Sequence, residues 1–260
     1  MPAKKKKLLI DADLIVYRSC VAVEKDVRWD DNYHILFSDF DDAWPNVELA
    51  FTRLFERFGT DNHVAALTTG RNFRYEVDPT YKGNRAETRK PLCFWRVREE
   101  MEKQYNVVSF EGIEADDILG IFATRDPNTI VCSVDKDLKT VPCTLFDGKQ
   151  VRKIDEYQAD RYFYSQVLTG DVADGYPGCP GVGEVKAEAI LKAAEDERNK
   201  QDDEFWRYRQ YAWRAIVKTY EKRGLTEADA LKQARLARIL RTTDWDAKAK
   251  KPILWTPPST

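Results

Sequence analysis

The sequence has little that would indicate a secreted, membrane or zinc protein. No apolar stretch approaches the roughly 18 residues of a membrane-spanning helix, and no signal peptide precedes the first apolar run. The five cysteines are an odd number without a Cys-x-x-Cys pair, and the only two histidines, His34 and His63, show no metal-ligand spacing. No serine or cysteine nucleophile with a matched histidine is visible. We therefore expect a reduced, soluble, cytoplasmic protein that does not bind a membrane.

Excess charge of one sign is also missing. The 42 basic and 44 acidic side chains leave a net charge of -2, whereas a simple nucleic-acid binder would be clearly basic. The two signs are nevertheless separated along the chain, because acidic residues recur at the ends of apolar runs and basic residues gather between Arg71 and Arg98. This pattern is typical of a protein that holds cations in one place and phosphates in another.

Apolar patterning predicts an α/β fold. With 260 residues, the chain is long enough for one α/β domain with a helical extension, or for two small domains. Strands alternate with helices up to about Ile154, which predicts a mainly parallel, twisted sheet flanked by helices, and the pattern beyond is helical. The polar segment from Arg71 to Lys90 predicts a long loop. The predicted strands are 8–10, 63–67, 107–108 and 129–134, and the predicted helices are 47–58, 91–104 and 114–123.

Carboxylates follow these strands. The carboxyl ends of parallel strands share one edge of a sheet, so the first three of four acidic groups should converge there. Two carboxylates ~5 Å apart repel by roughly 3 kcal/mol at an effective dielectric of about 20, so the cluster needs cations. An all-oxygen ligand set favours Mg²⁺ or Mn²⁺. Each group alone could instead stabilise a helix N-terminus through the helix dipole, or cap a turn. The four groups are Asp11 with Asp13; Glu114, Asp116 and Asp117; Asp135 with Asp137; and Asp171 with Asp174.

Two further segments favour phosphate binding. Tyr81, Lys82 and Arg85, followed by Arg89, place cations beside an aromatic ring that could stack on a base, unless the segment is only a solvated basic loop. The glycine-rich loop 175–183, with Gly181, Gly183 and then Lys186, precedes a helix whose N-terminus offers unpaired N–H groups. A tight turn between two helices is the other interpretation of that loop.

The chain resembles the flap-endonuclease superfamily of 5′-3′ exonucleases, and in particular the T7-type bacteriophage exonucleases. The resemblance covers nearly the whole chain in the order of the family. It depends on Leu9-Ile10-Asp11, Val77-Asp78-Pro79, Tyr81-Lys82, Asn84-Arg85, Lys90-Pro91, Glu114-Ala115-Asp116-Asp117, Asp135-Lys136-Asp137, Lys139-Thr140, Gly170-Asp171, Asp174-Gly175-Tyr176 and Ala237-Arg238-Ile239-Leu240-Arg241.

The resemblance implies a PIN/FEN-like fold and a nuclease that hydrolyses DNA from a 5′ end, nick or flap with two Mg²⁺ or Mn²⁺ ions. Asp11, Glu114, Asp116 and Asp117 match the first family cluster of metal ligands, and Asp135, Asp137, Asp171 and Asp174 match the second. Lys82 and Arg85 match catalytic basic residues of a helical arch. The DNA-binding set is Tyr81, Lys82, Arg85, Arg89, Gly181, Gly183 and Lys186.

The implied organisation has an α/β nuclease core at 1–153, with the basic arch segment at 71–98. A helical DNA-binding region at 154–250 contains a helix–turn–helix element at the glycine loop, where the family sometimes holds K⁺, and 251–260 is a tail. A monomer in the cytoplasm of an infected cell is expected, with RNA–DNA hybrid as another substrate.

One position departs from the family pattern. Thr69 stands where the family usually has another aspartate, which lowers the expected metal affinity unless Asp13 compensates. Two alternatives remain open at this point. One is a DNA-structure-binding relative with weakened catalysis. The other is a haloacid-dehalogenase-like phosphatase, suggested by Asp11-x-Asp13, although Ile15 stands where that family has Thr or Ser.

Overall fold

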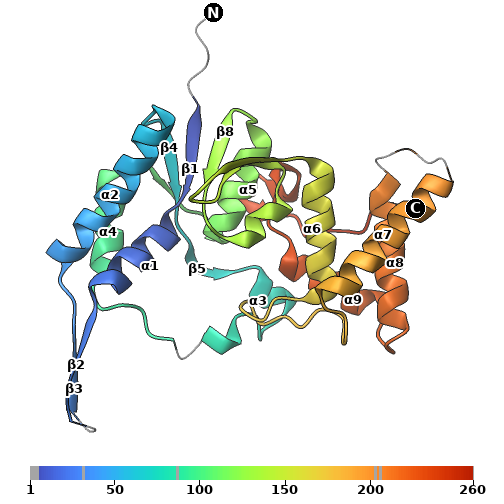
Figure 1. Ribbon diagram of the computed structural model, residues 1–260, viewed down its shortest axis with the longest axis horizontal. Helices are drawn as coiled ribbons and strands as arrows, with labels where there is room; N and C mark the ends of the chain where they lie inside the picture. The colour runs from blue at the N-terminus through green and yellow to red at the C-terminus, as the bar shows by residue number, and fades with distance from the viewer. Residues whose placement is uncertain (1–5, 31–32, 86–87, 202–203, 205–206, 260) are drawn as a thin grey trace, which may run out of the picture.

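A six-stranded sheet forms the centre of the protein (Figure 1). The computed structural model describes residues 6–30, 33–85, 88–201, 204 and 207–259. Neighbouring strands of this sheet are parallel except for the antiparallel pair at one edge, so the predicted mainly parallel sheet is confirmed. The strands, in spatial order, are β10 (Val151–Ile154), β9 (Cys143–Phe146), β8 (Thr129–Cys132), β1 (Lys7–Asp11), β4 (His63–Ala66) and β6 (Val107–Val108).

Both faces of β1 are buried, as expected for a central parallel strand. Leu8 and Ile10 pack beneath α1 (Ala12–Val23), α2 (Phe40–Phe58) and α4 (Phe94–Gln104). Leu9 faces the opposite way, against α5 (Ala115–Arg125), because successive side chains of a strand alternate between faces. Helices on both faces therefore hold the strand ends rigidly, which fixes the side chains that follow them.

The helices α6, α7, α8 and α9 form a second body beside the sheet. They enclose their own core, in which Phe163, Ala212 and Tyr220 are buried. Residues 251–259, which we expected to be a tail, include a strand and pack on this body, since Trp255 lies 5.1 Å from Trp213 between ring centroids. The elements are α6 (Glu156–Thr169), α7 (Glu184–Lys200), α8 (Tyr208–Glu221), α9 (Glu227–Ala237), η4 (Thr242–Asp244), β11 (Trp245–Asp246) and β12 (Lys251–Pro252).

The segment predicted to be a long loop contains local structure. It holds β5 (Thr69–Asn72), which pairs with β7 (Glu111–Gly112), the short helix α3 (Arg74–Val77) and η1 (Gly83–Arg85). Residues 86–87 lie outside the described residues. Among the helices described, none is long and apolar enough to cross a membrane.

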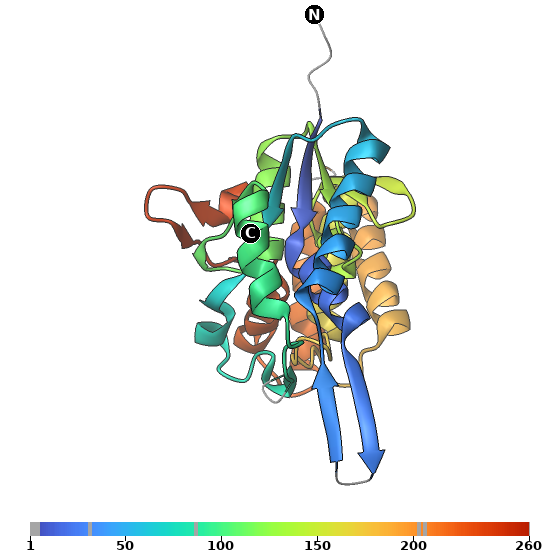
Figure 2. The same ribbon diagram turned by 90° about the vertical axis from the view of Figure 1, so that its left-hand side faces the viewer.

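A hairpin that the sequence did not predict projects between α1 and α2 (Figures 1 and 2). Its strands are β2 (Lys25–Asp30) and β3 (Tyr33–Phe37), and every residue of β2 is exposed. At its base Glu24 forms an ion pair with Arg89, so the hairpin is tied to the basic segment.

Candidate metal and nucleic-acid site

Asp11 and Asp135 emerge side by side at the sheet edge. Asp11 ends β1 and Asp135 follows β8, the adjacent parallel strand, and each caps the helix that comes next, α1 or η2 (Lys136–Thr140). Ser133 joins them: its hydroxyl donates to Asp11 Oδ2 at 2.6 Å and accepts from the Asp135 amide at 3.0 Å. The structure therefore brings together carboxylates that are 124 positions apart in the sequence.

Asp116 belongs to the same electrostatic neighbourhood. Burial, followed by the charges of Asp11, Asp135 and Glu114, holds the pKa of Asp116 well above its usual range. Burial likewise raises the pKa of Asp11 to about 6, with Asp13 and Asp135 adding to the effect. A group of acids that raise one another's pKa is a place where an external cation would be strongly favoured.

A second acidic group surrounds Asp137. Burial first, and then the charges of Asp135, Asp171 and Asp174, raise the pKa of this carboxyl to about 7. Asp171, which follows α6, pairs with Lys136 at 2.6 Å between Nζ and Oδ2. The sequence clusters thus lie next to each other and share Asp135 as a neighbour.

Lys82 and Arg85 lie over the acidic groups. The Lys82 ammonium is 2.6 Å from Glu114 Oε1 and 3.7 Å from Asp174 Oδ1, and Arg85 Nη2 is 2.9 Å from the same Asp174 oxygen. The backbone of Lys82 adopts the left-handed conformation, with φ 52, and its amide donates to the Asp174 carbonyl. Such a conformation is costly for a residue with a side chain, so the surrounding contacts hold Lys82 in place.

The position of Tyr81 does not fit the predicted stacking on a base. We expected its ring to stack on a base, but the residue is only 1% exposed and packs on Tyr75. Its hydroxyl lies 3.1 Å from Glu114 Oε2 and 3.0 Å from Asp174 Oδ2. The geometry therefore fits a residue that fixes two carboxylates and does not fit base stacking.

The geometry of Asp117 does not fit its predicted role as a metal ligand. It is fully buried, and Arg74 donates to both of its oxygens at 2.8 Å, one from each terminal nitrogen. The amides of Glu114 and Leu240 donate to it as well. With both oxygens engaged, Asp117 holds the α5 N-terminus in place and has no free oxygen directed at a cation.

Arg74 is the main residue that sequence reasoning missed. Besides Asp117, it donates to the carbonyls of Leu236 and Arg238 and lies 3.4 Å from Glu114. The Ala237–Arg241 motif is thereby joined to the acidic site through the Arg238 carbonyl. Nothing in the local sequence around Arg74 indicates burial, because its partners are 40 to 164 positions away.

Thr69, which stands where the family usually has an aspartate, is next to Thr68, and the two threonines make different contacts. Thr69 donates its hydroxyl to the Phe110 carbonyl, whereas the Thr68 hydroxyl accepts from the amide of Ala115 at the start of α5. The Thr68 amide donates to Asp13 Oδ2 at 2.9 Å, and Arg98 approaches the other oxygen. Asp13 therefore lies beside the position left without a carboxylate, and burial raises its pKa.

The predicted phosphate-binding loop has open space around Gly183, its last residue. A Cβ placed on Gly183, the N-cap of α7, would meet nothing within 4 Å. Gly181 has φ +72, and its carbonyl accepts from the Lys186 ammonium at 2.7 Å, so that ammonium lies against the loop. Arg89 is directed elsewhere, toward Glu24.

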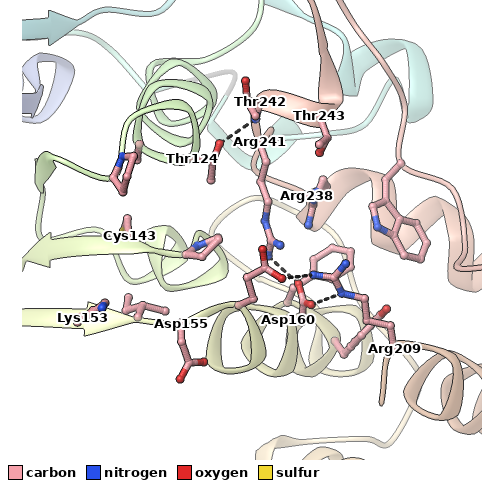
Figure 3. Close-up of a pocket in the computed structure, with 18 of the residues that line it drawn as sticks. Thr124, Cys143, Lys153, Asp155, Asp160, Arg209, Arg238, Arg241, Thr242 and Thr243 are labelled. Carbon is pink, nitrogen blue, oxygen red and sulfur yellow. Dashed lines mark hydrogen bonds and ion pairs between the residues drawn. The ribbon is translucent and has the colours of Figure 1, made fainter. Parts of the chain in front are cut away.

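A separate cavity of about 530 Å³ lies away from this site, and none of the predicted metal ligands lines it. In Figure 3, Arg209 and Arg241 converge on Asp160 from different elements. Arg238 pairs with Asp244 nearby, and Arg241 also donates to the Thr140 carbonyl. These paired charges join the helical body to the sheet and leave the cavity without a clear excess of either sign.

The described residues contain no group of three or more His, Cys, Asp or Glu side chains that could hold a metal ion as they stand. The donor chemistry nevertheless fits a hard divalent cation. Asp11, Asp116, Asp135 and Asp137 supply only oxygens, and within the described chain Asp116 has no ion-pair partner. Mg²⁺ needs only one or two protein carboxylates and keeps several waters, so it does not require a closed cage.

Comparison with known proteins identifies the class. The family of the 5′-3′ exonuclease N-terminal resolvase-like domain matches residues 6–166, and the chain belongs to this family. It is 30% identical to the exodeoxyribonuclease of Enterobacteria phage T3 over 97% of this chain and 93% of the relative. It is 28% identical to the exonuclease of Escherichia phage T7 over 96% and 93%.

Solved structures show the same fold. The T5 5′-exonuclease with bound zinc matches with a TM-score of 0.59 over 90% of this chain and 89% of that one, at 15% identity. The bacteriophage T5 flap endonuclease in a complex with DNA and metal ions matches with a TM-score of 0.55 over 89% and 92%, at 16% identity. The predicted fold class and family are confirmed.

Proposed function

We propose that this protein is a divalent-metal-dependent 5′→3′ exonuclease that hydrolyses phosphodiesters at 5′ ends, nicks or flaps of DNA. The observation that carries the proposal is the pair of adjoining acidic groups beneath Lys82 and Arg85, in a chain of the 5′-3′ exonuclease family. Family membership also removes the haloacid-dehalogenase alternative.

We infer that Asp11, Glu114, Asp116 and Asp135 would hold one Mg²⁺ or Mn²⁺, and that Asp137, Asp171 and Asp174 would hold the second. When bound, two such ions supply an activated water and stabilise the leaving oxygen of the phosphodiester. Asp117 is assigned a positioning role, because Arg74 and two amides occupy its oxygens. The hydrogen bond from the Thr68 amide to Asp13 supports Asp13 as the acid that compensates for Thr69.

Lys82 and Arg85 would position the scissile phosphate. Both cations already lie within ion-pair distance of Asp174, between the acidic groups and the open side. A phosphate drawn toward bound metal ions would meet them there, and their charges would offset the negative charge that grows during hydrolysis. The strained backbone of Lys82 supports a role for which its exact position matters.

The duplex would lie against the helical body. Gly181 and Gly183, at the N-terminus of α7, would offer backbone N–H groups to a phosphate, with K⁺ as a further ion at this loop. Cleavage of RNA–DNA hybrids, a monomeric state and action in the cytoplasm of an infected cell stay predictions.

The test is digestion of 5′-labelled blunt and 5′-flapped duplexes with Mg²⁺ or EDTA, using wild type, Asp135→Asn and Asp61→Asn. Asp61 is an exposed acid before β4 and serves as the control. We expect Mg²⁺-dependent release of label by wild type and Asp61→Asn and none by Asp135→Asn. Tight binding without cleavage in Mg²⁺ and in Mn²⁺ would refute the proposal in favour of a DNA-binding relative that has lost catalysis.

A further inference from the structure

A second groove, of about 1210 Å³, lies between the sheet body and α9. Its walls come from β5, α3, β7, α9 and β12; α3 and α9 mark it in Figure 1. The β5–α3 segment separates it from the acidic site: Arg74 faces Asp117, whereas Arg71 and Glu76 line the groove. We call it the β5–α9 groove.

The β5–α9 groove is basic although the protein as a whole is not. Two acids, Glu76 and Glu111, line it together with five cations. Of the cations, Lys232 is paired with Asp78, at 2.6 Å. Within the described ranges, the other four have no carboxylate in ion-pair distance, and three of these, Arg71, Lys250 and Lys251, are exposed. The five cations are Arg71, Lys232, Arg235, Lys250 and Lys251.

Lys250 is held at the groove by a strained turn. Its φ of 51 lies in the left-handed region, where a glycine or asparagine would be expected between paired strands. Asp246 orders the turn by accepting from the amides of Lys248 and Ala249. A lysine at this position costs stability relative to glycine, and its side chain adds a cation to the lining of the groove.

The lining of the groove suits an unpaired nucleic-acid strand. Besides the cations, the apolar residues Val77, Leu231, Pro252 and Leu254 line the groove. Cations beside apolar surface match the alternation of phosphates with sugars and base faces along a single strand.

We propose that the β5–α9 groove binds the unpaired continuation of the DNA strand that is not cut. The inference depends on the proposed function, since it takes DNA as the substrate. The cut strand enters beneath Lys82, so the complementary strand must leave the duplex end by another route. The β5–α3 segment lies between the two sites and would keep the strands apart.

The test is a binding measurement by fluorescence anisotropy in EDTA, where cleavage does not interfere. A blunt duplex is compared with duplexes that carry a single-stranded 3′ or 5′ extension, over a series of salt concentrations. The groove variant is Arg71→Gln/Lys250→Gly/Lys251→Gln, in which glycine relieves the strain at position 250. The matched control, Arg53→Gln/Lys149→Gln/Lys153→Gln, removes three exposed cations from elements that do not line the groove.

We expect wild type and control to bind the 3′-extended duplex more tightly than the blunt one, and the groove variant to bind both alike. Its affinity for the 3′-extended duplex should fall about 10- to 100-fold at 0.1 M salt, and the salt slope should decrease by about 2. Cleavage of saturating blunt duplex with Mg²⁺ should match wild type.

Three results would overturn the proposal: an unchanged preference of the groove variant for the 3′ extension; an equal loss of affinity on blunt duplex; or a loss confined to the 5′ extension. Failure of the proposed function would be distinguishable, because wild type would then cut no duplex whatever the groove binds.

Discussion

The neighbouring acids Asp116 and Asp117 should respond oppositely to the same substitution. Asp117→Asn removes the negative partner of a guanidinium that is only 3% exposed, which leaves Arg74 as a poorly compensated buried charge. Breaking a buried ion pair from one side costs about 3–5 kcal/mol. At about 2–4 °C per kcal/mol for a chain of this size, the melting temperature should fall by roughly 6–20 °C.

Asp116→Asn should have the reverse effect on the metal-free protein. Burial and three neighbouring acids oppose the charge of Asp116, so its removal relieves repulsion and should raise the melting temperature in EDTA. The same substitution should reduce stabilisation by Mg²⁺, which for wild type amounts to about 2.7 kcal/mol at a concentration 100 times the Kd.

Thermal unfolding of wild type and both variants, in EDTA and across a Mg²⁺ titration, checks these expectations together. Asp117→Asn should be less stable under both conditions yet keep its response to Mg²⁺, and Asp116→Asn should lose that response. An Asp117→Asn protein that is as stable as wild type in EDTA but insensitive to Mg²⁺ would refute the assignment, because Asp117 would then be a ligand.

Three other perturbations follow from the structure. Lys82→Ala should lower kcat at least 100-fold in a 5′-label assay while duplex affinity in EDTA stays near wild type, and unchanged turnover would remove Lys82 from the mechanism. In EDTA the melting temperature should rise as pH falls from 8 to 5.5, because Asp11 and Asp137, with pKa values raised to about 6 and 7, oppose folding only when charged; a flat profile would contradict this. Mg²⁺ affinity should fall over the same interval, as protons compete for the ligands. Gly178→Ala should destabilise by about 3 kcal/mol or more in urea unfolding, since its Cβ would come within 2.2 Å of the Gly170 amide, while Gly183→Ala should fold normally and lose only DNA affinity.

The sheet and its acidic edge were predictable because their signals are local. Leu8-Leu9-Ile10 is a short apolar run that ends at Asp11, and parallel pairing with β8 then brings Asp135 alongside. Strand order and burial follow from such runs without knowledge of distant contacts. The loop before α7 was recognisable for the same reason, because closely spaced glycines indicate turns with positive φ from the local sequence alone.

The roles within the acidic clusters were not predictable. Glu114-Ala115-Asp116-Asp117 shows three acids that look alike in sequence, yet Arg74, 43 positions away, donates to both oxygens of Asp117 and only weakly to Glu114. Tyr81 beside Lys82 suggested a stacking ring, and only the packed structure shows that ring buried. The β2–β3 hairpin was missed because its apolar residues face solvent and add nothing to the core pattern.

This division of roles explains how so many acids can share one edge of the sheet. Asp117 is neutralised within the fold by a buried arginine, and Glu114 is balanced by Lys82 and Arg74. Asp11, Asp116 and Asp137 instead face mainly other acids, so their charge is compensated from outside the chain or reduced by protonation. The internal pairs offset part of the charge repulsion within the fold, and the remaining acids favour a cation at this edge of the sheet. A single residue such as Lys82 lies on the boundary between the two groups, where a displaced ammonium could exchange Glu114 for a phosphate without leaving the site.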